Sequence, residues 1–288
     1  MDNHSPAIWL LPPDLRQYAE AFSGAEEIRL RQGRPPGVLL GGQERPVPGC
    51  RAVTGYDLDG VLERATGASV HTARDSVRSG FVSVKGGIRL GLCGSVITRL
   101  DRPDGIRRLS SVAIRIPREA RGCCDGVFPA LFREGFANTL ILSPPGGGKT
   151  TCLRELTRLL SESGVRVSLC DDRGEVAGIW NGESQFDLGP HTDVMSDAPK
   201  AETALMLLRC MNPQVLAMDE ITAPGDVQAA EEAVGCGVRL LATAHAENVA
   251  EFRTRPLYRR LLRDGVFKNA VVVENHAGAR SYRLEALP

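Results

Sequence analysis

Two patterns of apolar and polar positions alternate along the second half of the chain. Short, almost uninterrupted apolar runs, typical of strands buried on both faces, are followed by stretches in which leucine or alanine recurs every three or four residues, as on the inner face of a helix. The expected strands are 139–142, 165–170, 214–220 and 238–243, and the expected helices span 153–160, 200–211 and 227–234. Such alternation predicts a mostly parallel sheet, which a hairpin of 271–273 and 282–284 closes.

The first part of the chain has a different pattern, with short strands and glycine turns. The expected elements are a strand with period-two alternation at 27–31, a hairpin of 81–84 and 88–92 around the glycine turn 85–87, a strand at 113–118 and a helix at 125–133. We therefore predict a smaller α+β amino-terminal domain over 1–121 and an α/β domain over 122–288.

Composition narrows the class of protein. The 288 residues, 42% of them hydrophobic, can bury the cores of two ordinary domains. Thirty-five basic residues balance thirty-five acidic ones, so no excess of positive charge favours DNA or RNA.

No run approaches the roughly 18 apolar residues of a membrane-spanning helix. The start MDNHSPAIWLLPP does not resemble a signal peptide, so we expect a cytoplasmic protein. Eight scattered cysteines without C-x-x-C pairs predict reduced, mostly buried thiols.

The stretch LILSPPGGGKTTCLREL, residues 140–156, contains Gly-Lys-Thr where an apolar run gives way to a helical pattern. It fits the phosphate-binding loop G-x-x-x-x-G-K-[ST], except that serine replaces the first glycine at the end of the strand, where we expect it to be tolerated. Glycines let backbone N–H groups face phosphate oxygens, the lysine reaches the β- and γ-phosphates, and the threonine hydroxyl can hold Mg²⁺. The predicted nucleotide-binding residues are Ser143, Pro144, Pro145, Gly146, Gly147, Gly148, Lys149, Thr150 and Thr151.

Two carboxylates end the apolar run 214–220. Asp219, at the carboxyl end of a parallel strand, is predicted to hold Mg²⁺ together with Thr150, and Glu220 is predicted to orient and polarise the attacking water. An acidic strand end that merely faces solvent is the alternative. The phosphate-binding loop upstream, with Lys149 in a catalytic role, favours the nucleotide site.

Two further strands end in polar groups that would meet at the same edge of the sheet. The strand 165–170 runs into an acidic segment that contains Glu175, a candidate second carboxylate beside the water or the metal. The strand 238–243 ends at Thr243, and His245 follows, so both are candidate sensors of the γ-phosphate. A helix-capping acidic cluster and a structural histidine remain the alternatives.

The order GGGKTT, CDDRGEVAG, NPQVLAMDEIT and LLATAHAEN resembles the type II and type IV secretion ATPases, P-loop proteins of RecA-like fold with an additional strand and a catalytic glutamate. The stretches EIRLRQGRPP, RSGFVSVKGGIRLGLCGSVI and IRIPREARG resemble a sporulation family related to those ATPases, so the similarity spans nearly the whole chain. The resemblance implies a group of acidic residues, the acidic box, after the second strand of the nucleotide domain. Asp172 stands where the resemblance leads us to expect a glutamate of this box, which favours Glu175 for its role.

The resemblance implies a Mg²⁺-dependent ATPase with ATP and Mg²⁺ as cofactors. It implies a ring of copies of this chain, with six expected, whose partners are membrane proteins of the channel between mother cell and forespore in an endospore-forming bacterium. The protein would lie in the mother-cell cytoplasm, peripheral to the membrane, and nucleic acid is not an expected partner.

The resemblance also implies an arginine delivered from the amino-terminal domain to the phosphates. Arg115, between two isoleucines of an expected strand, is the predicted residue, and Arg89 has a weaker version of the same role; surface ion pairs are the alternative for both. Two other classes of function stay open. A nucleic-acid-dependent RecA-like ATPase is supported by three basic residues between 259 and 263. A scaffold that holds ATP without turnover is opposed by Glu220.

Overall fold

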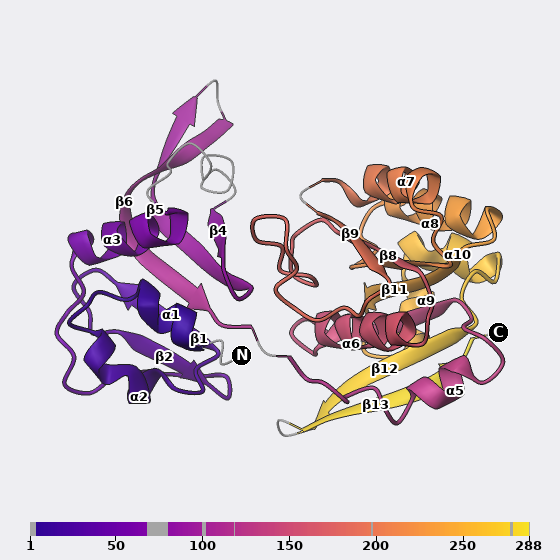
Figure 1. The fold of residues 1–288 in the computed structure, drawn as a ribbon, viewed down its shortest axis with the longest axis horizontal. Coiled ribbons are helices and arrows are strands. Elements are labelled where there is room, and N and C mark those ends of the chain that lie inside the picture. The colour runs from indigo at the N-terminus through magenta and orange to yellow at the C-terminus, as the bar shows by residue number, and fades with distance from the viewer. Residues whose placement is uncertain are drawn as a thin grey trace. The chain divides into compact units, whose positions relative to one another are not determined.

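The chain divides into two compact units in a computed structural model that describes residues 4–67, 80–99, 102–117, 119–196, 198–276 and 279–287 (Figure 1). The amino-terminal unit comprises 1–118 together with 178–185, and the carboxyl-terminal unit comprises 119–177 and 186–288. The sequence placed the boundary a few residues later, after 121, and did not anticipate that 178–185 would cluster with the first unit.

The amino-terminal unit is an antiparallel sheet with short helices. Its strands are β1 (Glu27–Arg31), β2 (Gly37–Leu40), β3 (Gln43–Pro46), β4 (Phe81–Val84), β5 (Ile88–Arg99) and β6 (Arg102–Arg115). Its described helices are α1 (His4–Leu10), α2 (Ala19–Phe22) and α3 (Gly55–Thr66), with the 3-10 turn η1 (Arg16–Tyr18). Across the described residues the strand order is β3-β2-β1-β6-β5-β4, and α3 packs against β4 and β6.

Local sequence explains two elements of this unit, of which only the strand 27–31 was predicted. Ile28 and Leu30 of β1 are fully buried, as the period-two alternation requires, and the predicted strand 27–31 is confirmed. Helix α3 begins with a capping box between Thr54 and Asp57, and it ends at Gly67, whose φ of 57° suits a left-handed cap.

The predicted hairpin of 81–84 and 88–92 is present as β4 and β5, but the long hairpin of β5 and β6 was not predicted. The expected strand 88–92 and residues 113–115 of the expected strand 113–118 form only one end of this two-stranded ribbon, which reaches beyond the rest of its sheet in Figure 1. Strand β6 ends at Arg115, and residue 118 of the expected strand lies outside the described residues. The added part is largely exposed, so it carries no alternating apolar pattern. Its register shifts at Gly94, where an added Cβ would lie 2.7 Å from the carbonyl oxygen of Arg108, a residue with a φ of 52°.

The carboxyl-terminal unit is a mostly parallel sheet, as predicted. Its strands are β7 (Thr139–Ser143), β8 (Val167–Asp171), β9 (Thr192–Ser196), β10 (Val215–Met218), β11 (Arg239–His245), β12 (Asn269–His276) and β13 (Ala279–Ala286). Its helices are α5 (Phe128–Phe132), α6 (Lys149–Glu162), α7 (Lys200–Cys210), α8 (Pro224–Gly235), α9 (Val249–Thr254) and α10 (Arg259–Arg263), with the 3-10 turn η2 (Pro256–Tyr258). Among the described residues the strand order is β13-β12-β7-β11-β10-β8-β9, and every neighbouring pair except β12 and β13 is parallel.

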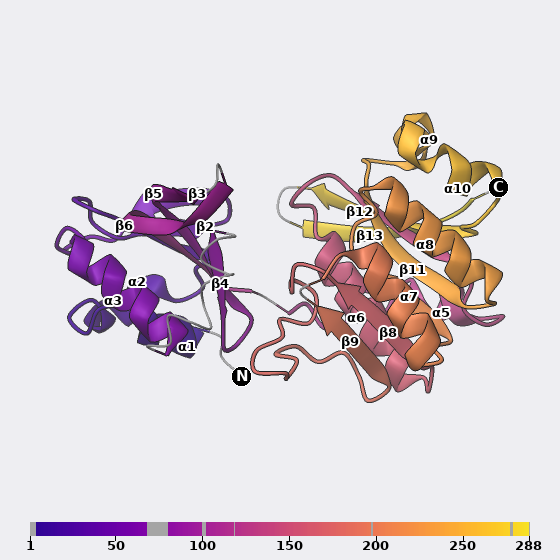
Figure 2. The ribbon, with the colours of Figure 1, turned by 90° about the horizontal axis from the view of Figure 1, so that it is seen from above.

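Helices cover both faces of this sheet (Figure 2). Leu140 and Leu142 of β7 pack with buried residues of α7 and α8 on one face, and α6 contacts β7, β8 and β11 from the other. Two faces that are both covered explain why these strands read as continuous apolar runs. None of the helices in the described part of the chain is long and apolar enough to cross a bilayer.

Two expectations about this unit and one about the cysteines of the whole chain were wrong or incomplete. The predicted helix 125–133 is a series of turns over 121–127 followed by the short α5. The sequence did not reveal β9, an edge strand whose side chains are only partly buried and which therefore lacks an apolar run. All eight cysteines are free, but only Cys124, Cys152 and Cys170 are buried, so the thiols are not mostly buried.

Candidate phosphate-binding site

The strand order brings the predicted site residues to one edge of the sheet. Strand β11 lies between β7, which precedes the glycine loop, and β10, which precedes the two carboxylates. His245 at the end of β11 is in register with Ser143 at the end of β7. Met218, one residue before Asp219, is in register with the middle of β11 and with the end of β8. Because these strands are parallel, their carboxyl ends share one edge, where ligands bind in open α/β sheets.

The glycine loop turns sharply into α6. Gly146 has a φ of 73° and Gly148 a φ of 107°, backbone conformations that favour glycine, and α6 begins directly after Gly148. Ser143 is fully buried at the end of β7, and a Cβ added to Gly147 would lie 1.7 Å from its Oγ. Ser143 is therefore accommodated, as expected, but it makes glycine obligatory at position 147.

A histidine bridges the loop lysine and the predicted catalytic glutamate. The buried Lys149 Nζ donates to the carbonyls of Ser143 at 3.0 Å and Pro144 at 3.2 Å, and it lies 2.7 Å from His245 Nδ1. On the other side of the ring, His245 Nε2 lies 2.9 Å from Glu220 Oε1. A neutral imidazole with its proton on Nε2 satisfies both contacts, since Nδ1 then accepts from Lys149 and Nε2 donates to Glu220. Burial lowers the pKa of Lys149, against the attraction of Glu220 and Asp219.

Asp219 lies in a buried position that suits a cation. Burial raises its pKa to about 6, and the charges of Asp171 and Glu175 act in the same direction. The hydroxyl of Thr243 reaches Asp219 Oδ1 at 3.5 Å. The described residues contain no cluster of three or more His, Cys, Asp and Glu that could hold a metal alone. A donor set of one carboxylate and the Thr150 hydroxyl fits Mg²⁺, which keeps several waters and takes further oxygens from nucleotide phosphates.

The acidic segment after β8 is folded by two buried groups. Asp171 is fully buried, and its carboxylate accepts hydrogen bonds of 2.8 to 3.2 Å from three consecutive backbone N–H groups, those of Glu175, Val176 and Ala177. Arg154 of α6 approaches from the other side, with its Nε 2.7 Å from the Val176 carbonyl oxygen and its Nη2 2.7 Å from that of Glu175. Burial raises the pKa of Asp171 although these N–H groups oppose the shift.

Arg154 was not among the predicted site residues. Its signal in the sequence is a cation between Leu153 and Leu156, on the face of the helix that the apolar spacing buries. Asp172, where the resemblance led us to expect glutamate, pairs with Lys200 at 3.0 Å. The charge of Glu175 acts on both Asp171 and Asp219, so Glu175 belongs electrostatically to this edge of the sheet.

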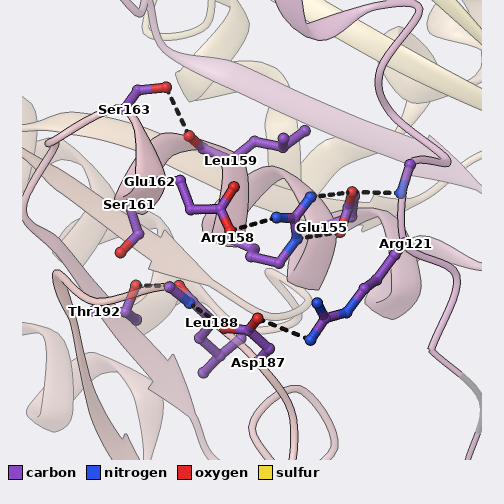
Figure 3. A network of polar contacts seen from close by, with 12 residues as sticks. Arg121, Glu155, Arg158, Leu159, Ser161, Glu162, Ser163, Asp187, Leu188 and Thr192 are labelled. Atoms are coloured by element: carbon purple, nitrogen blue, oxygen red, sulfur yellow. Dashed lines mark hydrogen bonds and ion pairs between the residues drawn. The ribbon is translucent and has the colours of Figure 1, made fainter.

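A second polar network anchors the start of the carboxyl-terminal unit on α6 (Figure 3). Glu155 accepts a hydrogen bond of 2.7 Å from the N–H of Gly122 and pairs with Arg158 at 2.7 Å, and Arg158 also pairs with Glu162 at 2.6 Å. Arg121 pairs with Asp187 at 2.8 Å. The helix that begins at the glycine loop is thus held at its middle as well as at its start.

Arg115 and Arg89 belong to the amino-terminal unit. Arg115 Nε lies 3.1 Å from Glu27 Oε2, across the register of β1 and β6, and its side chain is largely exposed. Arg89 is directly opposite Arg115 on β5 and lies 4.2 Å from the ring centre of Phe81. The surface ion pair that was the alternative for Arg115 is present, and its role at the phosphates stays a prediction.

The fold and site define a class. A glycine loop between a buried strand and a helix, with an additional strand separating it from the strand that carries Asp219, is the RecA-like P-loop ATPase fold, preceded here by an α+β domain.

Comparison with known proteins identifies the family. The chain belongs to the family described as sporulation stage III, protein AA, whose family model matches residues 14–283. It is 36% identical over 247 residues to stage III sporulation protein AA of Bacillus subtilis (strain 168), a match that covers 84% of this chain and 80% of that protein. The resemblance to a sporulation family is therefore confirmed.

Solved structures confirm the fold. The ATPase DotB of Legionella pneumophila superposes with a TM-score of 0.64 at 16% identity, covering 96% of this chain and 80% of that one. The pilus retraction motor PilT with bound ADP superposes with a TM-score of 0.67 at 13% identity, covering 96% and 82%. At these identities the likeness establishes the secretion-ATPase fold.

Proposed function

We propose that this protein is a Mg²⁺-dependent ATPase that drives a secretion-type assembly during sporulation. The observation that carries the proposal is the chain of contacts from Lys149 through His245 to Glu220, at the edge where Asp219 also ends its strand. These contacts support the proposal, because a lysine able to meet the γ-phosphate and a carboxylate able to orient water lie on either side of one histidine at the edge of the sheet where ligands bind.

The residues divide the work of ATP hydrolysis between them. The first N–H groups of α6 and the loop bind phosphate oxygens, and Lys149 exchanges its contact with His245 for the γ-phosphate. Glu220, held by His245 Nε2, accepts a hydrogen bond from the attacking water and aligns it with the phosphorus. Thr150 and Asp219 would hold Mg²⁺, which would supply positive charge against the charge of the phosphates. Glu175 is a further carboxylate beside the water or the metal, and its charge acts on Asp219.

The finer assignment is supported by the family to which the chain belongs. We propose that copies of the chain form a ring, with six expected, on the mother-cell side of the channel between mother cell and forespore. The partners are that channel's membrane proteins, which the ATPase meets as a cytoplasmic protein peripheral to the membrane. Arg115, with Arg89 in support, supplies a cation to the phosphates from the amino-terminal unit, so Arg115→Ala lowers turnover at saturating ATP and Arg89→Ala does so less.

A nucleic-acid-dependent ATPase has less support. Of the three arginines that favoured it, Arg260 pairs with Glu231 at 2.5 Å and Arg263 with Asp264 at 3.0 Å. Charges neutralised within the chain contribute little to binding phosphate backbones. Stimulation of turnover by DNA would favour this second candidate.

Phosphate release by the full-length protein with Mg²⁺ and ATP tests the proposal. Wild-type protein should turn over, and Lys149→Ala should abolish turnover by removing the charge that meets the transferring phosphoryl group. Lys268→Ala, which removes an exposed lysine elsewhere in the same unit, is the matched control and should be active. Equal release by Lys149→Ala and wild type would show that phosphate release does not come from this site.

A further inference from the structure

An arginine from the last strand lies against the glycine loop. A Cβ added to Gly148 would lie 2.9 Å from Nε of Arg280 and 3.0 Å from its Cζ. The guanidinium group of Arg280 therefore covers the α-carbon of the residue that caps α6, directly before Lys149. Position 148 favours glycine because of its φ of 107°, and the side chain of Arg280 packs over the face that a Cβ would occupy.

The register of the sheet explains this placement. Strand β12 runs parallel to β7 and pairs Val272 with Leu142, so its last residues extend past the end of β7, where the glycine loop begins. Strand β13 returns antiparallel to β12 and pairs Arg280 with Asn275. Arg280 is thereby carried to the carboxyl-end edge of the sheet, the edge that also holds His245 and Asp219.

The charge of Arg280 is available to a ligand. The side chain is exposed, and within the described part of the chain no carboxylate forms an ion pair with it. Arg283, on the same strand, is the opposite case, since its guanidinium pairs with Glu274 at 2.8 Å and with Glu285. These two exposed arginines of β13 therefore have different surroundings. Arg283 is neutralised by carboxylates of the chain, whereas Arg280 lies beside the phosphate-binding loop.

We propose that Arg280 binds phosphate oxygens of the nucleotide held by the glycine loop of its own chain. A guanidinium group presents several N–H donors in a planar fork that matches phosphate oxygens, and beside the amino terminus of α6 it adds a full positive charge to the partial charge of the helix. The proposal rests on the proposed nucleotide-binding function. It differs from the role predicted for Arg115, because Arg280 belongs to the carboxyl-terminal hairpin of the same unit as the loop.

Nucleotide affinity of the full-length protein tests the inference. Dissociation constants for ADP and for ATP with Mg²⁺ are measured by calorimetry for wild type, Arg280→Ala, Arg280→Lys and the matched control Arg283→Ala. We expect Arg280→Ala to weaken both affinities about 10- to 100-fold, as the loss of a charge-assisted contact predicts. Arg280→Lys should recover part of the loss, because lysine keeps the charge without the fork. Arg283→Ala should bind like wild type.

Salt dependence separates a charge contact from packing against the loop. If Arg280 meets phosphate, the ADP affinity of Arg280→Ala should depend less on ionic strength than that of wild type. Unchanged affinity in Arg280→Ala, or weakened affinity with the wild-type salt dependence, would overturn the inference. Absence of ADP and ATP binding by wild type would instead contradict the proposed function, so the two failures are distinct.

Discussion

Nδ1 of His245 lies 2.7 Å from Nζ of Lys149, so the loop lysine and the last residue of β11 are direct neighbours at the edge of the sheet. The other ring nitrogen contacts Glu220, so the histidine links the residue predicted to meet the γ-phosphate with the residue predicted to orient the water. Arrival of a phosphate at Lys149 would change one contact of His245 and leave the other in place. Sensing and water alignment can therefore be coupled through one imidazole.

Replacement of His245 should slow hydrolysis more than it weakens binding. In His245→Ala, Glu220 loses the donor that orients it, and we expect kcat to fall roughly 10- to 100-fold, as for loss of one positioned transition-state group. The KM for ATP should change less. His191→Ala is the control, because the His191 ring is hydrogen-bonded to the carbonyl oxygen of Ser161 and not to Lys149 or Glu220. An unchanged kcat in His245→Ala would contradict the link.

Glu220→Gln should separate binding from chemistry. Glutamine keeps the shape of glutamate but cannot polarise water as a carboxylate does, so turnover should fall by about 100-fold or more while ATP still binds. Calorimetry gives the affinity and phosphate release the rate. Glu232→Gln, at an exposed glutamate of α8, is the control. Loss of ATP binding together with turnover would mean that Glu220 is a structural residue.

The unusual serine of the glycine loop can be tested by a double-mutant cycle. Gly147→Ala should abolish nucleotide binding, because the added Cβ would meet Ser143 Oγ at 1.7 Å. Ser143→Gly alone should bind nucleotide nearly as well as wild type, with about 0.5–1 kcal/mol less stability from the added backbone freedom. The double variant should bind better than Gly147→Ala, since only the Pro144 carbonyl at 3.0 Å still opposes the methyl group. Binding by Gly147→Ala as strong as in wild type would show that the loop relaxes at no cost.

Arg154 should be required for the order of the acidic segment. Arg154→Lys keeps the charge but cannot reach the carbonyls of Glu175 and Val176 together, so the free energy of unfolding should fall by about 2–4 kcal/mol. Hydrogen exchange of the backbone N–H groups of 175–177 should become faster than in wild type. Arg166→Lys, at an exposed arginine of the same unit, is the control. Unchanged exchange at 175–177 would show that Asp171 alone orders the segment.

Neutralising Asp219 should stabilise the protein at neutral pH while it removes the proposed magnesium ligand. The folded pKa of about 6 lies above the ordinary value of 3.8, so the stabilising effect of the bound proton is complete below pH 3.8 and lost as the pH rises through 6. The free energy of unfolding of Asp219→Asn should therefore exceed that of wild type by at most about 3 kcal/mol at pH 8, and by about half of that at pH 5. Chemical denaturation without divalent cations at both pH values measures this. A variant equally or less stable than wild type at pH 8 would refute the buried-charge account.

Elements and site residues that are marked by a local pattern of residue types could be predicted from the sequence. A strand buried on both faces must be an apolar run, and a backbone that wraps phosphate must be rich in glycine, so 139–150 could be interpreted without knowledge of its neighbours. Asp219 and Glu220 could be assigned for the same reason, because they directly follow such a run. The exposed ribbon of β5 and β6 and the edge strand β9 lacked a pattern, since their side chains face solvent and are not selected for apolarity.

The sequence by itself therefore determined the class of site and the strand ends that carry it. Only the tertiary structure decided which side chains meet there: His245 between Lys149 and Glu220, Arg154 on the acidic segment, and Arg280 over Gly148. Each of these contacts joins residues on different elements, and the order and register of the strands bring them together. Strand order and register depend on the packing of the whole sheet, a global balance of burial that no local pattern of residues contains.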